Sequence, residues 1–333
     1  MPSKSPSKSF DVIAIGNAIV DVLAHADDGF LADHDMAKGS MQLIDEATAH
    51  QLYADMGPAI EASGGSAANT AAGVASLGSR AGFVGRVRDD ELGEVFVHDI
   101  RAAGVEFRAP AATSGPATAR CLILMTADAE RTMNTFLGAS SLISPGDIDE
   151  AFVASAEIVY CEGYLWDLPD AQAALTKGMD AARAAGGKVA FTLSDSFCVD
   201  RHRAGFLDLA EHRIDILFAN EAEICSLYEV DSFDEAAAAV AGHCEIACLT
   251  RSEKGSVVIT SDGQRVEVPA HPVEVVDTTG AGDLYAAGFL HGLARGDDLE
   301  RCARMGSLAA AEVISHVGAR PEDDLLALFE REL

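Results

Sequence analysis

Short apolar runs alternate with alanine-rich helical patterns along most of this chain, and this alternation constrains the fold more than any other feature of the sequence. The expected strands are Asp11–Gly16, Ala81–Val87, Ile158–Cys161, Lys188–Leu193, Ile214–Ala219, Ile246–Thr250 and Ser256–Thr260. The expected helices are Ala67–Leu77, Leu92–Ala103, Ala171–Ala185, Ala204–Glu211, Glu221–Leu227, Asp234–Gly242, Leu284–Ala294, Leu299–Ser315 and Asp323–Arg331. This order predicts a mostly parallel sheet with helices on both faces, and ligands at the loops beyond the carboxyl ends of the strands.

Two regions, at about residues 18–44 and 105–136, interrupt the alternation with short segments between turn signals. We expect them to form a small second sheet that covers the strand ends as a lid; ordinary surface hairpins are the alternative. The polar residues 1–9 predict a disordered tail, which leaves residues 10–333 as the α/β domain. The open edges of a lid sheet are compatible with a monomer or with a homodimer through the lid.

Composition narrows the classes of function. The 333 residues are 49% hydrophobic, enough for a large core, and carry 24 basic against 53 acidic side chains, a net charge of −29. So acidic a surface argues against nucleic acids and anionic membranes as partners. Seven cysteines without a CxxC pair indicate reduced thiols and a cytoplasmic location, and the apolar run Val12–Ile15 is too short for a signal peptide or a membrane span.

The stretch VVDTTGAGDLYAAGFLHGLA, Val275 to Ala294, contains the most distinctive local pattern. A glycine loop precedes helical spacing and places the carboxylate of Asp283 in the first turn of the helix. Free backbone N–H groups point outward at such a turn, which makes it a site for an anion. An acidic residue there also stabilises the helix through its dipole. From this stretch alone, a functional role and a purely structural role for Asp283 are therefore equally well supported.

A second glycine-rich stretch, ASGGSAANTAAGVASLG, runs from Ala62 to Gly78. Gly64 and Gly65 allow a turn that approaches a ligand closely, and the amide of Asn69 follows in the first turn of a helix. The alternative is a close-packed helix of small residues. Neither stretch contains GK[ST], and AIGNAIVD lacks GxGxxG spacing, which weakens readings as a P-loop or dinucleotide-binding protein.

Three weaker motifs follow strands. GNAIVD places Asn17 and Asp21 beyond the first strand, and FANEAE places Asn220 and Glu223 at a helix start, where a capping box is an adequate explanation. LTRSEKGSVV, with Gly255 in its turn, has the form of a simple hairpin.

Taken in order, these motifs resemble the ribokinase-like (PfkB-type) carbohydrate kinases from about Phe10 to Pro321. GGSAANTA and DTTGAGD are similar to the two family signatures, NEAE to the family's NxxE, and LTRSEKG to its LTxGxxG, with Ser252 in place of the first glycine. GNAIVD, AERTMN and the serine in GGSAAN most resemble the adenosine kinase branch. Ribokinases typically carry a lysine where Ser66 stands, which argues against plain ribose as substrate.

The resemblance implies a three-layer α/β/α fold with a small β-sheet lid, and transfer of the γ-phosphoryl group of ATP to the 5′-hydroxyl of adenosine, giving AMP and ADP. Kinases of another nucleoside or of a sugar (ribose, fructose, 2-keto-3-deoxygluconate) are the alternative, and a non-catalytic ligand-binding protein on this fold is a more distant one. The partners would be these small molecules.

The resemblance also implies roles for residues. Asp283 would be the catalytic base, and Gly280, Ala281 and Gly282 the anion hole. Glu223, with Asn220, would organise Mg²⁺ through water, and K⁺ would lie beside Asp277, Thr279, Val313 and Gly318. Residues implied on the substrate side are Asn17, Asp21, Leu43, Gly65, Ser66, Asn69, Phe136 and Tyr164, with Tyr164 stacking on the base. Residues implied on the ATP side are Arg131, Asn220, Thr250, Ser252, Gly255, Thr278 and Gly306.

Overall fold

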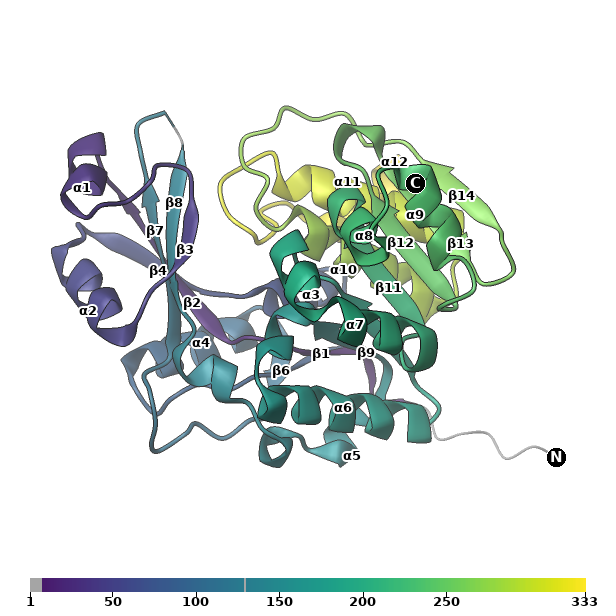
Figure 1. Cartoon of the computed structure of the whole chain (residues 1–333), viewed down its shortest axis with the longest axis horizontal. Coiled ribbons are helices and arrows are strands. Elements are labelled where there is room, and N and C mark those ends of the chain that lie inside the picture. The colour runs from purple at the N-terminus through teal and green to yellow at the C-terminus, as the bar shows by residue number, and fades with distance from the viewer. Residues whose placement is uncertain (1–7, 129) are drawn as a thin grey trace.

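The computed structural model describes residues 8–128 and 130–333 and contains two sheets (Figure 1). The larger sheet has nine strands in the order β14-β13-β12-β11-β10-β9-β1-β5-β6. Its strands are β1 (Phe10–Ile15), β5 (Ala81–Val84), β6 (Val105–Phe107), β9 (Ala156–Glu162), β10 (Lys188–Thr192), β11 (Ile216–Asn220), β12 (Ile246–Thr250), β13 (Ser256–Thr260) and β14 (Arg265–Val268). Neighbours pair in parallel except β13, which is antiparallel to β12 and to β14.

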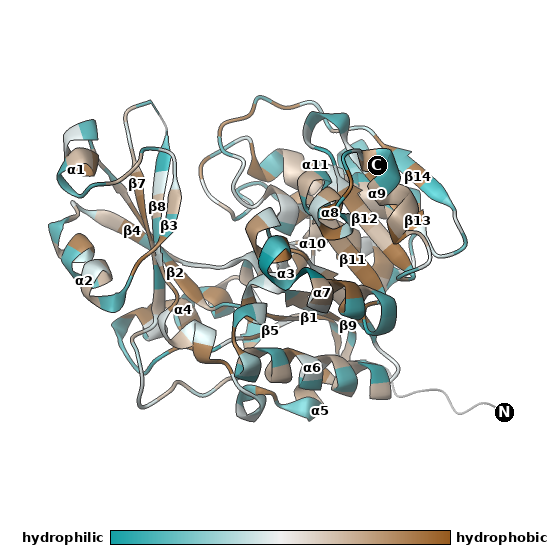
Figure 2. Ribbon diagram, in the orientation of Figure 1, coloured by the Kyte–Doolittle hydropathy of each residue, from teal (hydrophilic) through white to brown (hydrophobic). Residues whose placement is uncertain are grey.

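Helices cover both faces of this sheet, and the strand cores are apolar (Figure 2). On one face lie α3 (Ser66–Ser76), α4 (Glu91–Ala102), α10 (Ala281–Arg295), α11 (Leu299–Val313) and α12 (Leu325–Glu332). On the other lie α5 (Glu150–Val153), α6 (Pro169–Ala184), α7 (Ser196–His212), α8 (Glu221–Tyr228) and α9 (Phe233–Val240). Successive residues of β1 enter the two cores alternately, as the period of a strand requires, and the predicted three-layer α/β/α fold is confirmed.

The second sheet has the order β3-β8-β7-β2-β4 and stands beside the larger body (Figure 1). Its elements are β2 (Ile19–His25), β3 (Met41–Leu43), β4 (Ala59–Gly64), β7 (Ala119–Met125) and β8 (Arg131–Phe136), with helices α1 (Asp28–Asp33) and α2 (Glu46–Asp55). We call this sheet the lid. Short 3₁₀ turns elsewhere are η1 (Gly138–Leu142), η2 (Pro145–Asp147), η3 (Gly163–Asp167) and η4 (Ser252–Lys254).

The lid differs from the expected segments at two strands. β4 lies outside them, because AIEASG lacks the β-branched alternation that marks a strand. β6 was expected in the lid, yet it pairs with β5 at the edge of the large sheet. Three-residue strands such as β6 have too little sequence to show a pattern.

Other boundaries also differ from the sequence-based expectation. α7 begins eight residues before Ala204, at Ser196, with a kink at His202 (φ −123°) that interrupts the helical periodicity. Two residues of the expected tail contact the domain, since Lys8 Nζ donates to Ala154 O (2.8 Å) and Ser9 N to Ser155 O (2.9 Å); residues 1–7 lie outside the described residues.

The topology directs attention to the carboxyl ends of β1 and β9. These strands are adjacent and parallel, and the chain order runs outward from them in opposite directions along the sheet. Such a reversal leaves a crevice at the strand ends, which is where open α/β sheets bind their ligands. Asn17, beyond β1, and Glu162, the last residue of β9, meet there.

We expect Gly288→Ala to destabilise the protein by about 1–3 kcal/mol, because overpacking a fixed backbone contact costs that much. A Cβ at Gly288 in α10 would stand 2.5 Å from the carbonyl oxygen of Met305 in α11. Gly57→Ala is the control, since a Cβ there meets no atom within 4 Å. Urea unfolding measures both; an equal midpoint shift in the two variants would contradict this account of the α10–α11 contact.

Candidate active site

The N-terminus of α10 presents unpaired backbone donors. Gly280 precedes the helix with φ +80°, and a Cβ there would also lie 2.9 Å from Ala319 Cα, so both conformation and space call for glycine. The first helical bond runs from Leu284 N to Gly280 O (2.8 Å), which leaves the N–H groups of Gly282 and Asp283 without a partner in the helix. No side chain among the described residues caps this end. Backbone geometry here suits an anion.

The carboxylate of Asp283 is held by the other glycine-rich stretch. Ser66 Oγ donates to Asp283 Oδ1 (2.6 Å) and Asn69 Nδ2 to Oδ2 (3.0 Å). Burial raises the pKa of Asp283, and the bonds from Ser66 and Asn69 oppose that shift. The two stretches that the sequence singled out separately therefore converge on one carboxylate.

The side-chain oxygen of Asn69 is a buried acceptor that lacks a hydrogen-bond donor in the part of the chain that the structure describes. The side chain is 5% exposed, and Oδ1 has no hydrogen-bond partner among the described residues. A buried acceptor without a donor is costly, and native proteins rarely keep one without a reason. A hydroxyl group of a bound molecule could donate to it beside Asp283.

Asp21 lies across the same turn. A Cβ at Gly64 would meet Asp21 Oδ2 at 2.2 Å, so this carboxylate rests directly on the glycine backbone. Burial raises the pKa of Asp21 to about 6, against the opposing charges of Arg320 and Arg131. Gly65, next in the chain, has φ +95° and starts α3.

Glu162, which the sequence-based analysis did not single out, is fully buried behind these residues. It accepts hydrogen bonds from Asn17 N (2.7 Å), Asn17 Nδ2 (2.6 Å) and Ala67 N (2.8 Å). Asn17 Oδ1 in turn accepts from Ser140 Oγ (2.9 Å), so Asn17 is anchored by its surroundings. Burial raises the pKa of Glu162 to about 7. A single Glu ending a strand carries no motif, and only its burial shows its importance.

One face of the lid is largely apolar around Asp21. Cross-strand register aligns Asp21, Cys121, Thr135 and Leu43 in one row. The next row holds Leu23, Ile123, Met133 and Met41. Leu43 is 62% exposed on this face, which leaves it free to contact a ligand.

Two aromatic residues expected to contact a base differ in position. Phe136 lies on the opposite lid face, because its register partner is Arg120; the Arg120 guanidinium stands 5.9 Å from the Phe136 ring. The expectation that Phe136 lines a pocket for the base is therefore wrong. Side chains alternate along the strand, so Thr135 lies on the face with Asp21 and Phe136 on the opposite face. Tyr164, in η3, is partly exposed after β9, and its hydroxyl donates to Ser194 O (3.3 Å).

Arg131 and Asp277 form an ion pair between the lid and the loop before α10. Arg131 Nη1 lies 2.7 Å from Asp277 Oδ2, and both side chains are 9% exposed. A contact of Arg131 with a phosphate would require this pair to open. Asp277 Oδ1 accepts from Thr279 N (3.1 Å) and Thr279 Oγ1 (2.7 Å), and Oδ2 from Gly318 N (3.0 Å).

These contacts bear on the expected K⁺ site. Each oxygen of Asp277 already has two partners, so its carboxylate has no lone pair left for a cation. Val313, the last residue of α11, is fully buried. The side chain of Asp277 does not fit a K⁺ ligand in this arrangement, and we derive no step through K⁺.

Four of the residues expected on the ATP side lie at or just beyond the ends of β11 and β12: Asn220, Thr250, Ser252 and Gly255. Asn220 and Thr250 are register partners, and Glu223 forms a capping box with Asn220, whose N–H it accepts at 3.0 Å. Burial raises the pKa of Glu223 to about 7. Each Glu223 oxygen accepts one hydrogen bond, which leaves a lone pair on each for a water molecule of hydrated Mg²⁺.

The remaining ATP-side residues divide between loop and packing positions. Ser252 has φ +50°, a conformation that favours glycine, and Gly255 has φ +85° with a Cβ position 2.1 Å from Val268 O. Thr278 is exposed in the loop before α10. Gly306 lies inside the α10–α11 contact, where a Cβ would meet Tyr285 O at 2.7 Å, so packing alone accounts for that glycine.

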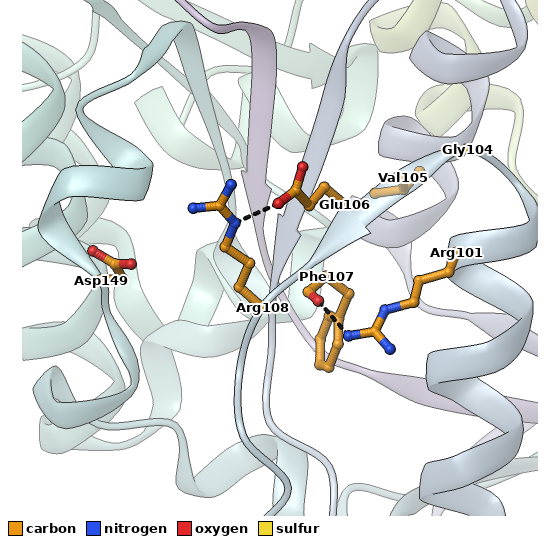
Figure 3. Close-up of a pocket in the computed structure, with 7 residues that line it drawn as sticks. All are labelled: Arg101, Gly104, Val105, Glu106, Phe107, Arg108 and Asp149. Atoms are coloured by element: carbon orange, nitrogen blue, oxygen red, sulfur yellow. Dashed lines mark hydrogen bonds and ion pairs between the residues drawn. The ribbon is translucent and has the colours of Figure 1, made fainter.

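A separate hollow lies at the outer edge of the large sheet (Figure 3). It is lined by Arg101, Gly104, Val105, Glu106, Phe107, Arg108 and Asp149. Its arginines are engaged: Arg108 pairs with Glu106, and Arg101 donates to Phe107 O (2.9 Å). The residues expected in the site from the sequence do not line it.

We expect Glu162→Gln to flatten the dependence of stability on pH between about 4.5 and about 7. Folded Glu162 keeps its proton up to a pKa of about 7, whereas the unfolded chain releases it near 4.5. The group therefore makes folding less favourable as pH rises through this window, by up to about 1.4 kcal/mol per pH unit. Urea unfolding at several pH values measures the slope. Glu157→Gln, on the exposed start of β9, should keep the wild-type slope, and a wild-type slope in Glu162→Gln would contradict the assignment.

No helix in the described part of the chain is long and apolar enough to cross a membrane.

Residues 60–324 match the pfkB family of carbohydrate kinases. The chain is similar to the adenosine kinase from Sinorhizobium meliloti, whose crystal structure is known. The two sequences are 51% identical, and the structures align with a TM-score of 0.89 over 97% of this chain and 99% of that one. A probable sugar kinase from Rhizobium etli is 48% identical, with a TM-score of 0.90 and coverage of 97% and 98%. An ATP-dependent ribose-1-phosphate kinase of Halopiger xanaduensis is 31% identical over 82% of this chain and 88% of its own length. With its two glycine motifs joined at Asp283, the chain belongs to the pfkB family of carbohydrate kinases.

Proposed function

We propose that this kinase transfers the γ-phosphoryl group of ATP to the 5′-hydroxyl of adenosine. The observation that carries the proposal is the carboxylate of Asp283, held by Ser66 and Asn69 at the open N-terminus of α10. The similarity to the Sinorhizobium meliloti adenosine kinase supports the acceptor.

In the proposed mechanism the acceptor hydroxyl lies between Asp283 and the N-terminus of α10. Asp283 accepts its proton as the bond to phosphorus forms, which suits a loose transition state in which proton transfer comes late. The N–H groups of Gly282 and Asp283 stabilise charge on the transferring phosphoryl group. A second acceptor hydroxyl donates to Asn69 Oδ1, the buried atom that lacks a partner.

Asp21 and the lid would fix the rest of the nucleoside. The Asp21 carboxylate, at the edge of the Gly64 turn, suits a bidentate hydrogen bond from vicinal ribose hydroxyls. The apolar row behind it, with Leu43, offers a surface for the base, and Tyr164 a ring for stacking. Glu223 and Asn220 would hold Mg²⁺ through its waters, and the bound ion would neutralise phosphate charge.

A sugar kinase is the second candidate. The similarity to a probable sugar kinase and to a ribose-1-phosphate kinase favours it. A small sugar would use Asp283, Asn69 and Asp21 but leave the apolar lid face without a partner. The two candidates therefore differ in the lid and share the catalytic end of the site.

Asp283→Asn should lower turnover by several orders of magnitude and leave acceptor binding nearly unchanged, because the amide keeps the shape but accepts no proton. ADP release with Mg-ATP measures turnover, and isothermal titration calorimetry measures binding. Turnover close to that of the wild type would rule out Asp283 as the base. A faster rate with a free sugar than with adenosine would instead move the sugar kinase to first place.

Leu43→Glu should reduce kcat/KM for adenosine by about 10- to 100-fold, the usual effect of losing an apolar contact of this size. Transfer to a free sugar should change little, since a sugar does not reach the apolar face. Leu326→Glu is the matched control: Leu326 is 43% exposed on α12, away from the lid. Equal losses for adenosine and for a sugar would argue against a base slot at Leu43.

A further inference from the structure

The segment between α11 and α12 joins the two glycine motifs. Gly318 N donates to Asp277 Oδ2 (3.0 Å), and Ala319 packs against Gly280 at the start of α10. Arg320, the next residue, reaches the other motif. Ala319 and Arg320 lie outside the motifs that the sequence singles out, yet this segment contacts both glycine motifs.

The guanidinium of Arg320 clamps the turn that begins α3. Its Nη2 donates to Ser63 O (2.8 Å) and Ser63 Oγ (2.9 Å), its Nε donates to Ser63 O (3.3 Å), and its Nη1 donates to Ala68 O (2.9 Å). Ser63 and Ala68 flank Gly64, on which Asp21 rests, and Ser66, which binds Asp283. The planar fork of arginine thus fixes both ends of the turn that holds the two site carboxylates.

The same guanidinium places a partly buried positive charge among carboxylates. Burial lowers the pKa of Arg320 to about 10, and the charges of Asp99, Asp21 and Asp283 oppose that shift, so Arg320 is a cation at neutral pH. Asp99 also accepts from Ser63 N (2.7 Å) and Ser63 Oγ (2.6 Å), which completes the frame around the turn.

Several groups face Asp283 from the elements packed around it. Ser66 and Asn69 of α3 donate to its carboxylate, and Arg320 provides an opposite charge. The charge of Asp283 in turn raises the pKa of Asp21 of the lid and of Glu162 of β9, and it acts in the same direction on the phenols of Tyr160 and Tyr164. Loss of the Arg320 charge would leave Asp283 facing carboxylates.

We propose that Arg320 is a positioning residue of the phosphoryl transfer: its fork fixes the turn that holds Asp283, and its positive charge favours a negative charge on that carboxylate. This inference rests on the proposed role of Asp283 as the base. It does not depend on which alcohol is the acceptor, because the turn and the carboxylate are shared by nucleoside and sugar.

The test compares Arg320→Lys, which keeps the charge without the fork, with Arg320→Gln, which keeps donors without the charge. In Arg320→Gln the pKa of Asp283 should rise, so the acidic limb of kcat/KM against pH should move upward by about one pH unit. Arg320→Lys should keep the wild-type limb while kcat falls. Equal limbs in wild type and Arg320→Gln, or an equal upward shift in both variants, would overturn the proposal. If the Gln variant does not fold, an upward shift in the Lys variant alone would contradict it.

A second measurement separates this proposal from the proposed function. The ¹³C chemical shift of the Asp283 carboxyl, assigned by its absence in Asp283→Asn, reports its titration in the ligand-free protein. The Asp21→Asn variant identifies the signal of Asp21, so that it is not mistaken for the signal of Asp283. If the pKa of Asp283 is raised in Arg320→Gln and the wild-type enzyme does not phosphorylate adenosine, the role of Arg320 is upheld and adenosine is refuted as the acceptor. An unchanged pKa would refute the role of Arg320 whatever the acceptor. Arg304→Gln, on the exposed side of α11, is the control variant.

Discussion

The contact between α3 and α10 is the constraint on which the site depends. A Cβ at Gly73 would meet Ala287 Cβ and Leu284 Cδ1 at 2.7 Å each, so the two helices approach as closely as their backbones allow. Both helices begin with a glycine at positive φ, Gly65 and Gly280, and both present their N-termini at the same end. Small residues on both helices, which looked in the sequence like ordinary packing, are what bring Ser66 within 2.6 Å of Asp283.

Much of this arrangement could be predicted from sequence, and the failures have physical causes. The long periodic helices and the buried strands were located because their patterns extend over many residues. β4 was missed because it lacks β-branched alternation, and β6 was assigned to the wrong sheet because it has only three residues. Phe136 was expected in the base slot because alternation cannot be assigned before register is known. Glu162 and Arg320 act through burial and long-range contacts, to which local patterns are blind. The roles assigned by family resemblance to Asn220, Glu223 and the glycine loops remain predictions about ligands.

Burial sets the electrostatic character of the site. Asp21, Glu162 and Glu223 all have pKa values raised by desolvation, to about 6, about 7 and about 7. A chain with a net charge of −29 offers these groups little relief from outside, so Arg131 and Arg320 provide the positive charge locally. The lid takes part in this balance, because Arg131 comes from β8 and pairs with Asp277 of the other body. One ion pair therefore joins the lid to the loop before α10.

The connection between lid strand β4 and helix α3 of the site is very short. β4 ends at Gly64, and α3 begins at Ser66, so a single residue joins a lid strand to the helix that holds Asp283. One residue inserted there would rotate α3 by about 100° relative to β4 and carry Ser66 and Asn69 away from the carboxylate. The long excursion between β2 and β4 has no such coupling, since its loops and helices end in the lid. A change of chain length can therefore be absorbed in that excursion, whereas the junction after β4 must keep its length.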